Sequence, residues 1–278
     1  MSADDKYPQE SGRRRFVKGV VGAASLAAVG TTGAVTVDSA TNRSGAGGGT
    51  TQYFGVENTG GPAPRGMPLI PIQIDSDGYV QGRYPSGGGA HPTMDIGGIE
   101  YSPSWFQYCG VQQYQGLQPS YEGDNYFRYV PSSSPNAYDW HADMAGNRIN
   151  VGDFEGYETW GNGIGKSGLG MPAAGTWRSQ NVDNSMPVQL IRSTRIEEAA
   201  QNPQTPGEEF LAAASDQGVI AILDKCTHFC CVPGFKLSAQ SEKFDAENDI
   251  FCPCHQSVYD PFSIVKVSFV AYPRPEEG

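Results

Sequence analysis

The cysteines of this 278-residue chain are concentrated in one short region. Five of the six lie between residues 226 and 254, in the segments C-T-H-F-C-C-V-P (226–233) and C-P-C-H-Q-S-V-Y-D (252–260). Each segment offers a cysteine and a histidine at close spacing, C-x-H in the first and C-x-x-H in the second. A thiolate is a soft ligand and an imidazole a borderline one, so these pairs suit zinc or an iron–sulfur cluster with two unlike irons. The two segments together therefore predict a metal centre.

The two segments resemble the cluster-binding boxes of the Rieske iron–sulfur protein family, which run C-T-H-x-G-C and C-P-C-H-G-S-x-Y. The resemblance implies one 2Fe–2S cluster per chain. It implies that Cys226 and Cys252 bind one iron and that His228 and His255 bind the other. A structural zinc site with two cysteines and two histidines is the alternative, but it explains neither the second cysteine of each segment nor the serine and tyrosine that follow.

Four further positions extend this resemblance. It implies that Cys231 and Cys254 form a disulfide that ties the two loops together over the cluster, which requires an oxidising compartment. It also implies that Ser257 and Tyr259 donate hydrogen bonds to a bridging sulfide and to a ligand cysteine sulfur. Such donors stabilise the reduced cluster, and neutral histidines lower its negative charge. We therefore expect a potential at the high end of the Rieske range of about −150 to +300 mV.

The resemblance covers residues 185–278 and implies a mainly β fold, a Rieske-type antiparallel β-sandwich that carries the two loops. Residues 186–198 look like the strand and helix that precede the cluster loops in Rieske subunits of cytochrome bc complexes. A helix is expected over 195–200, with Thr194 as its N-cap and Glu197 at its third position. Strands are expected over 188–192, 219–223, 249–251 and 265–271.

Residues 53–180 show no resemblance to a known family. Short apolar runs broken by Gly, Pro, Ser and Asn, without long 3.6-residue periodicity, predict β and loop structure there, including an insertion at about 85–180. His91 and His141 lie in polar loops, so we expect surface histidines. The tryptophans are expected to anchor the core of the insertion; they are Trp105, Trp140, Trp160 and Trp177.

The chain departs from the family pattern at several positions. Cys230 and Gln256 stand where the family has glycine, so each loop must accept a side chain. The Gly-Pro-Ala-Pro loop that shields the cluster in the family is missing after Asp260. The same letters at 61–64 are treated as a coincidence, and shielding is expected from Phe269 or from the insertion.

Two cysteines have no role in the family pattern. Two ligands and one disulfide use four of the six cysteines, which leaves Cys109 and Cys230. In an exported protein these two could pair with each other and tie the insertion to the first loop.

The N-terminal region resembles a twin-arginine export signal. Arg13 and Arg14 are followed by Phe16 and Lys18, and then by 19 uncharged residues, which as a helix reach about 28 Å, close to the thickness of a hydrocarbon core. This route carries folded proteins, chiefly those that acquire a cofactor before export. A cleaved signal peptide is the alternative to a retained single-pass anchor. The predicted regions are a cytoplasmic segment (1–18), a transmembrane anchor (19–37), a flexible hinge (38–52) and an extracytoplasmic Rieske domain (53–278).

Charge and composition narrow the class of partner. The chain has 19 basic and 30 acidic residues, a net charge of −11, which argues against nucleic acid as a partner. Few of the basic residues are lysines, and an acidic, lysine-poor surface suits a halophilic source. Hydrophobic residues make up 38% of the chain, which excludes wholesale disorder.

The resemblance implies a membrane-bound electron-transfer subunit without an independent catalytic site. In a cytochrome bc-type complex it would stand beside a cytochrome b-type subunit, oxidise quinol through contact with His255 or His228, and release a proton. The electron would pass to a cytochrome c or a small blue-copper protein. The first alternative is an exported Rieske subunit of a molybdenum oxidoreductase such as arsenite oxidase. A soluble Rieske ferredoxin usually lacks the disulfide pair, and an oxygenase would have only His91 and His141 left for a second iron.

Overall fold

The computed structural model describes residues 49–86, 92–118 and 120–271, within a compact unit that comprises Ala40–Gly278. The predicted twin-arginine segment (1–18), the predicted anchor (19–37) and His91 lie outside the described residues. No helix in the described part of the chain is long and apolar enough to cross a membrane.

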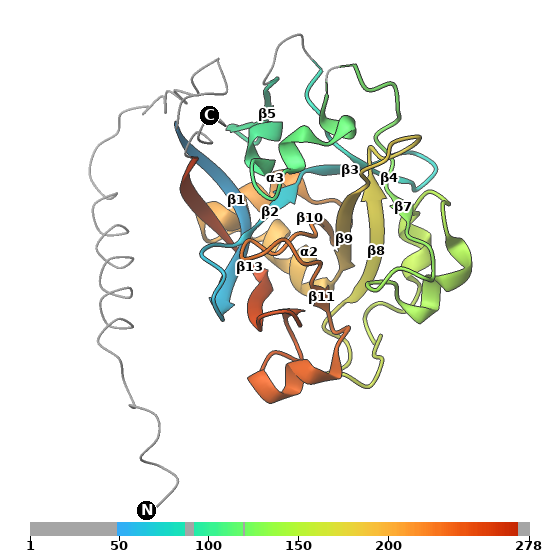
Figure 1. Ribbon diagram of the computed structural model, residues 1–278. Helices are drawn as coiled ribbons and strands as arrows, with labels where there is room; N and C mark the ends of the chain where they lie inside the picture. The colour runs from blue at the N-terminus through green and yellow to red at the C-terminus, as the bar shows by residue number, and fades with distance from the viewer. Residues whose placement is uncertain (1–48, 87–91, 119, 272–278) are drawn as a thin grey trace, which may run out of the picture. The chain divides into compact units, whose positions relative to one another are not determined.

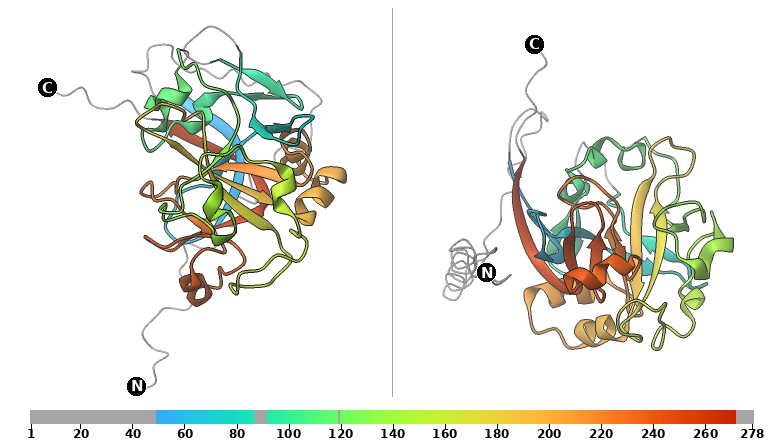
Figure 2. Two further views of the ribbon diagram at one scale, coloured as in Figure 1. Left: turned by 90° about the vertical axis from the view of Figure 1, so that its right-hand side faces the viewer. Right: turned by 60° about the horizontal axis from the view of Figure 1, so that its bottom comes forward.

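The fold is mainly β, as predicted, and is built on one curled antiparallel sheet (Figures 1 and 2). Nine strands follow one another in the order β11-β12-β13-β1-β2-β10-β9-β8-β7. Two separate hairpins, β3-β4 and β5-β6, accompany the sheet. The strands are β1 (Gly49–Gly60), β2 (Met67–Ile70), β3 (Ile72–Ile74), β4 (Val80–Gly82), β5 (Met94–Ile96), β6 (Ile99–Tyr101), β7 (Arg128–Tyr129), β8 (Met171–Trp177), β9 (Met186–Arg192), β10 (Val219–Leu223), β11 (Gly234–Phe235), β12 (Ile250–Cys252) and β13 (Ser257–Ala271).

Strand β2 is the corner at which two halves of the sheet meet. Its first two residues, Met67 and Pro68, pair with β1, and its last two, Leu69 and Ile70, pair with β10. All four side chains are buried, so the strand contributes to the core while it changes partners. In Figure 1, β1 and β13 lie on one side of β2, and β10, β9 and β8 lie on the other.

In the described part of the chain, two α-helices and several 3-10 helices pack around the sheet. Ser193 caps α2 by accepting a hydrogen bond from the Arg195 N–H at 3.2 Å, so the prediction that Thr194 is the cap was one residue too late. Thr205 caps α3 in a capping box with Glu208, a signal that was present in the sequence. The helices are α2 (Thr194–Gln201), α3 (Pro206–Ala214), η2 (Pro103–Phe106), η3 (Val111–Gln113), η4 (Gln115–Leu117), η5 (Asp139–Met144), η6 (Val151–Phe154) and η7 (Ala239–Phe244).

The predicted insertion at about 85–180 is part of the same architecture. Its strands β7 and β8 extend the nine-stranded sheet beyond β9. Trp177 and Trp105 are buried in the core, and Trp140 and Trp160 pack against it as partly buried rings, in line with their predicted anchoring role.

The prediction that His141 lies on the surface was wrong. Its side chain is fully buried, and its Nε2 accepts hydrogen bonds from the backbone N–H groups of Tyr138 at 3.4 Å and Ala174 at 3.2 Å. The Tyr129 and Trp140 rings lie against it, each with its centroid 4.9 Å away. His141 is therefore a core residue that satisfies backbone donors.

The predicted hinge at 38–52 extends too far along the chain. Strand β1 begins at Gly49, which pairs with Ala271, and the ladder with β13 continues through Tyr53 opposite Val267. Residues 49–52 therefore belong to the sheet, and the rest of the predicted hinge lies outside the described residues.

Candidate metal centre

Backbone hydrogen bonds close both candidate loops; the first leads into β11 and the second leaves the adjacent strand β12. The first follows β10, and within it the Cys226 N–H donates to the Cys231 carbonyl at 2.8 Å and the Cys230 N–H to the Cys226 carbonyl at 3.0 Å. The second joins β12 to β13, where Cys252 pairs with Ser257. Backbone hydrogen bonds therefore fix the shape of each loop.

The structure contains two disulfides, and each involves the first loop. Cys231 is bonded to Cys254 of the second loop with their Cα atoms 6.7 Å apart, and Cys109 is bonded to Cys230 with a Cα separation of 5.5 Å. The first pairing is the one implied by the family resemblance, and the second is the pairing that the sequence left open. The adjacent residues Cys230 and Cys231 are thus tethered to two different parts of the chain.

The remaining two cysteines, Cys226 and Cys252, are free and fully buried. Hydrogen bonds from Cys252 and from the buried Tyr259 together lower the pKa of the Cys226 thiol to about 5. The contact with Cys226 raises the pKa of Cys252. The pair therefore favours one thiolate inside the protein, which is the form that binds a metal.

The two histidines of the loops lie side by side nearer to the surface. The ring centroids of His228 and His255 are 4.8 Å apart with the rings at 89°, and His255 is exposed while His228 is half-buried. The Phe229 ring packs on both, at 4.3 Å from His228 and 5.3 Å from His255, and is itself 67% exposed. The loops thus present two imidazoles and one apolar ring outward, with the thiols behind them.

Two polar atoms at these loops are buried without a hydrogen-bond partner in the described structure. They are Nδ1 of His228 and Oγ of Ser257. Six further buried polar atoms of the described residues, Nδ1 of His141 among them, also lack a partner, so such an atom is not by itself evidence of a bound group. A group held between the loops, ligated by the His228 nitrogen and accepting a hydrogen bond from Ser257, fits this donor set.

The arrangement of the ligand-type side chains does not match a single zinc ion. A tetrahedral zinc site places four ligand atoms within about 4 Å of one another. Among the described residues, the group whose ligand atoms lie within 4.8 Å consists of Cys231, Cys252 and Cys254, and two of these are joined in the disulfide. The four predicted ligands do not form one such group, so they are more widely spread than a mononuclear site requires.

Tyr259 connects β13 to the first loop. Its buried hydroxyl lies 3.1 Å from Sγ of Cys226 and accepts a hydrogen bond from the Thr227 N–H at 3.2 Å. The residue therefore occupies the place in which a donor to a ligand cysteine was predicted. Ser257, the other predicted donor, is buried at the start of β13.

Residues 61–65, which include the Gly-Pro-Ala-Pro letters treated as a coincidence, lie against both loops. An ideal Cβ on Gly61 would stand 2.2 Å from the Gln256 carbonyl oxygen, and Gly61 has a φ of +75°. The Thr227 hydroxyl donates to the Arg65 carbonyl at 2.5 Å. This segment, which joins β1 to β2, is a third wall of the site.

Phe269, another residue expected to shield the cluster, contacts this third wall through Arg65. The Arg65 guanidinium lies over the Phe269 ring with its carbon 4.2 Å from the centroid. Phe269 is half-buried, and its other neighbour is the buried Tyr53 ring at 5.8 Å.

The two positions at which the family has glycine both take the left-handed backbone conformation here. Cys230 has a φ of +65° and Gln256 a φ of +59°. Such a conformation costs a side-chain-bearing residue about 1–2 kcal/mol. The loops therefore keep a backbone that glycine would adopt more readily.

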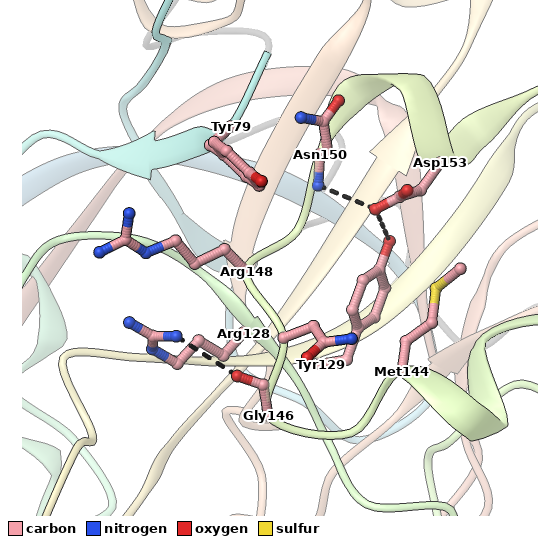
Figure 3. Close-up of a pocket in the computed structure, with 9 residues that line it drawn as sticks. Tyr79, Arg128, Tyr129, Met144, Gly146, Arg148, Asn150 and Asp153 are labelled. Atoms are coloured by element: carbon pink, nitrogen blue, oxygen red, sulfur yellow. Dashed lines mark hydrogen bonds between the residues drawn. The ribbon is translucent and has the colours of Figure 1, made fainter. Parts of the chain in front are cut away.

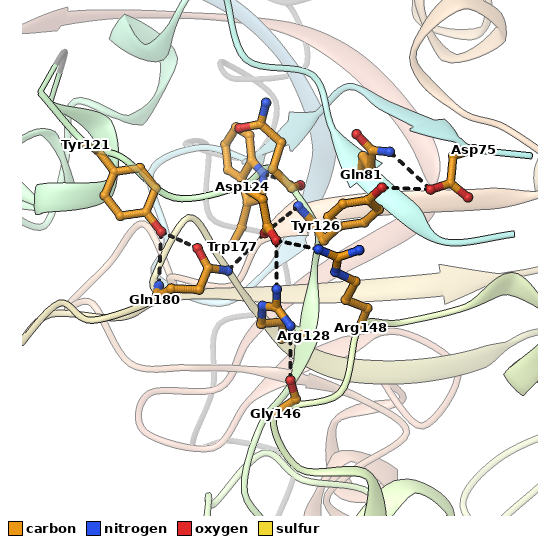
Figure 4. Close-up of polar contacts among 11 residues, drawn as sticks. Asp75, Gln81, Tyr121, Asp124, Tyr126, Arg128, Gly146, Arg148, Trp177 and Gln180 are labelled. Atoms are coloured by element: carbon orange, nitrogen blue, oxygen red, sulfur yellow. Dashed lines mark hydrogen bonds and ion pairs between the residues drawn. The ribbon is translucent and has the colours of Figure 1, made fainter. Parts of the chain in front are cut away.

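A polar pocket of about 540 Å³ lies elsewhere, beside β7 (Figure 3). Arg128 and Arg148 both donate to Asp124, at 2.8 and 3.0 Å, and Asp153 accepts hydrogen bonds from Tyr129 and from the Asn150 N–H (Figures 3 and 4). Both arginines of the lining are thus paired with Asp124, and Asp153 is the one carboxylate among the lining residues. It is lined by Tyr79, Arg128, Tyr129, Met144, Gly146, Asn147, Arg148, Asn150 and Asp153.

Comparison of the chain with protein-family models, curated proteins and solved structures finds no match. The inference of function therefore depends on the residues and geometry of the two loops.

Proposed function

We propose that the chain is a one-electron carrier that holds a high-potential Rieske-type 2Fe–2S cluster between its two disulfide-linked loops. Cys226 and Cys252 are the cysteine ligands, and His228 and His255 are the histidine ligands. The observation that carries the proposal is the spatial arrangement of these groups. Two free, buried thiols lie behind two neighbouring imidazoles, on loops that are joined by the Cys231–Cys254 disulfide.

Several features of the surrounding fold support this assignment. The left-handed backbone at Cys230 and Gln256 is the conformation for which glycine is best suited, and the family has glycine at both positions. The sheet that turns its corner at β2 is compatible with a Rieske-type sandwich. The segment at 61–65 covers the loops, although it comes from a different part of the chain than the family's shielding loop.

The unsatisfied polar atoms assign roles within the site. Nδ1 of His228, which is buried and lacks a partner, would be the nitrogen that ligates iron, and the Ser257 hydroxyl would donate to a sulfide. Tyr259 donates to the Cys226 sulfur. When bound, such a cluster supplies a reversible one-electron site, and these two hydroxyl donors favour its reduced form.

The outer surface of the loops suits contact with a small, partly apolar electron donor. The exposed His255 imidazole offers a nitrogen that can accept a hydrogen bond and take up a proton from a hydroxyl group. The exposed Phe229 ring beside it provides an apolar surface. A quinol, which has a hydroxylated ring and releases one electron together with a proton, matches both groups.

The proposed setting is an energy-converting membrane complex. The chain is retained by its N-terminal anchor with the cluster domain on the extracytoplasmic side, beside a cytochrome b-type subunit, and passes electrons to a cytochrome c or a blue-copper protein. The two disulfides suit the oxidising side of a membrane. The acidic composition, with a net charge of −11, supports a halophilic source and argues against nucleic acid as a partner.

Metal analysis of the purified full chain tests the proposal. We expect iron and acid-labile sulfide in equal amounts, with His255→Gln and Cys252→Ala each losing both. His141→Gln is the matched control, because His141 is a core residue that contacts backbone amides rather than the loops. Zinc in place of iron, or full iron content in the Cys252→Ala variant, would overturn the assignment.

Membrane fractions distinguish the two proposed complexes. Co-purification with a cytochrome b-type subunit and a spectral shift of the cluster upon addition of a quinol-site inhibitor are expected. Co-purification with a molybdopterin-containing subunit, without a response to the inhibitor, would favour the arsenite oxidase type of complex instead.

A further inference from the structure

A short segment of the predicted insertion, residues 108–114, contacts the first ligand loop at three places. The Tyr108 hydroxyl donates to the Lys225 carbonyl at 2.8 Å, directly before the ligand Cys226. Cys109 is bonded to Cys230, and its Sγ also lies 3.8 Å from the Cys226 carbonyl oxygen. Farther along, the Lys225 ammonium group lies 5.8 Å from the centroid of the Tyr114 ring.

These contacts enclose the loop from both ends. Tyr108 holds the residue before Cys226, and Cys109 holds Cys230, so His228 stands in the middle of a loop that is fixed on either side. The next residue, Cys231, is held as well, by its disulfide to Cys254. The tethers at Cys230 and Cys231 run to segments that are 121 residues earlier and 23 residues later in the chain.

The Cys109–Cys230 bridge joins two residues with unfavourable backbone conformations. Cys230 has a φ of +65° and Cys109 a φ of +55°, both in the left-handed region. A residue with a side chain adopts this region roughly tenfold less readily than glycine does. A covalent bond between these positions holds the loop in a shape that its sequence alone disfavours.

We propose that Tyr108 and Cys109 are positioning residues of the metal centre. Together they form a clamp that fixes the orientation of His228 by holding the loop closed at Lys225 and Cys230. A glycine at position 230 would adopt the left-handed conformation readily, whereas here the clamp holds Cys230 in it. This gives the insertion a role in the site: its segment 108–114 is the support of the histidine ligand.

The link to His228 as an iron ligand rests on the proposed function, but the clamp itself is tested without iron. Hydrogen exchange of the metal-free, disulfide-intact full chain reports loop closure through the amide at position 230, which donates to the Cys226 carbonyl at 3.0 Å. We expect this amide to exchange about tenfold faster in Cys109→Ala/Cys230→Ala than in the wild-type protein.

The variant Cys109→Ala/Cys230→Gly lacks the bridge as well but relieves the left-handed conformation. Its exchange is expected to lie closer to that of the wild type than to that of the alanine pair. Tyr108→Phe keeps the bridge and the ring, so it remains informative if the bridge-free variants do not fold. We expect a severalfold acceleration in Tyr108→Phe, confined to the first loop.

Tyr121→Phe is the matched control, because the Tyr121 hydroxyl accepts a hydrogen bond from the Gln180 N–H at 3.0 Å within the same predicted insertion, outside the clamp (Figure 4). It is expected to leave the exchange of the first loop unchanged. Wild-type exchange at position 230 in both Cys109→Ala/Cys230→Ala and Tyr108→Phe would overturn the clamp.

A spectroscopic measurement on the iron-loaded chain tests the orientation of His228 separately. The nitrogen hyperfine coupling of the reduced cluster is expected to broaden in Cys109→Ala/Cys230→Ala and to sharpen again in Cys109→Ala/Cys230→Gly. Identical coupling in the wild type and both variants would overturn the positioning role. A wild-type chain that binds no iron, with the expected exchange pattern, would instead count against the proposed function and leave the clamp standing.

Discussion

The hydroxyl of Tyr259 lies 3.1 Å from Sγ of Cys226, and both residues are buried. The two residues come from different parts of the sheet, because Tyr259 belongs to β13 and Cys226 follows β10. The same hydroxyl accepts the Thr227 N–H. One side chain therefore sets both the polarity around a proposed ligand sulfur and the position of the loop that carries it.

Tyr259→Phe should lower the reduction potential of the loaded protein. A donor to a charged sulfur contributes about 1.5–3 kcal/mol, and it stabilises the more negative, reduced state. The bond is present in both redox states, so only the difference in its strength shifts the potential. Because about 1.4 kcal/mol corresponds to roughly 59 mV for one electron, we expect a decrease of no more than about 130 mV. Redox titration measures this decrease in reduction potential. Tyr79→Phe, at the pocket beside β7, is the control and should leave the potential unchanged.

Ser257→Ala should have different consequences in the two forms of the protein. In the metal-free chain the buried Ser257 hydroxyl interacts at most with the Cys226 thiolate, so its removal should change the free energy of unfolding by no more than about 1 kcal/mol. In the loaded chain the same substitution should lower the potential, because a donor to the cluster is lost. Urea denaturation and redox titration measure the two effects. A larger destabilisation of the metal-free form would show that Ser257 has another partner.

Gly61→Ala should disturb the third wall of the site. The substitution carries the cost of a left-handed φ and a clash with the Gln256 carbonyl oxygen. Gly98→Ala is the matched control, since Gly98 has a φ of +84° and open space around the added Cβ. Both should lose about 1 kcal/mol of unfolding free energy, and Gly61→Ala should lose roughly 1–3 kcal/mol more and release iron faster. Equal losses for the two would contradict the packing of this segment on the loop.

His141 should make the protein less stable in mild acid. Burial lowers the pKa of His141, whereas in the unfolded chain a histidine titrates at about 6.5. The unfolded chain therefore binds this proton more tightly, and unfolding free energy is lost as the pH falls below about 6.5, by up to roughly 1.4 kcal/mol per pH unit.

His141→Gln keeps an acceptor for the backbone amides of Tyr138 and Ala174 but does not titrate. Urea denaturation at about pH 7.5 and about pH 5 should show a smaller loss of stability for this variant than for the wild type. Because the carboxylates are common to both proteins, their contribution cancels in the comparison. Parallel pH profiles would contradict the burial of an uncharged His141.

The ligand loops could be predicted from the sequence because the residues that identify each loop lie close together in the chain. Cys226 and His228, like Cys252 and His255, lie within a few residues of each other, so spacing alone suggests a metal. Of the strands that flank the loops, β10 and most of β12 were predicted, since runs such as Val219–Leu223 are entirely apolar and entirely buried, whereas β11 and the first eight residues of β13 were not.

The rest of the site depends on contacts between residues that are far apart in the chain. Gly61 meets Gln256 across nearly two hundred residues, and no local pattern indicates that approach. The Gly-Pro-Ala-Pro letters were the available signal, but their position in the chain argued against them. The pairing of Cys109 with Cys230 could be proposed by elimination, whereas its grip on the loop through Tyr108 required the structure.

His141 is another residue whose environment could not be predicted from the local sequence. Its partners are the backbone N–H groups of Tyr138 and Ala174, and the second of these lies 33 residues farther along the chain. Surrounding polar residues suggested a surface loop, but tertiary packing of aromatic rings buries the imidazole. Composition around a residue is a weak guide to burial when the partners are non-local.

The most direct test of the central claim is the nitrogen hyperfine coupling of the reduced protein, measured by pulsed electron paramagnetic resonance on the purified full chain. We predict a 2Fe–2S signal coupled to two histidine nitrogens, which is lost in His228→Gln and His255→Gln and retained in His141→Gln. A cluster signal without nitrogen coupling, or a reduced protein without any cluster signal, would contradict the account.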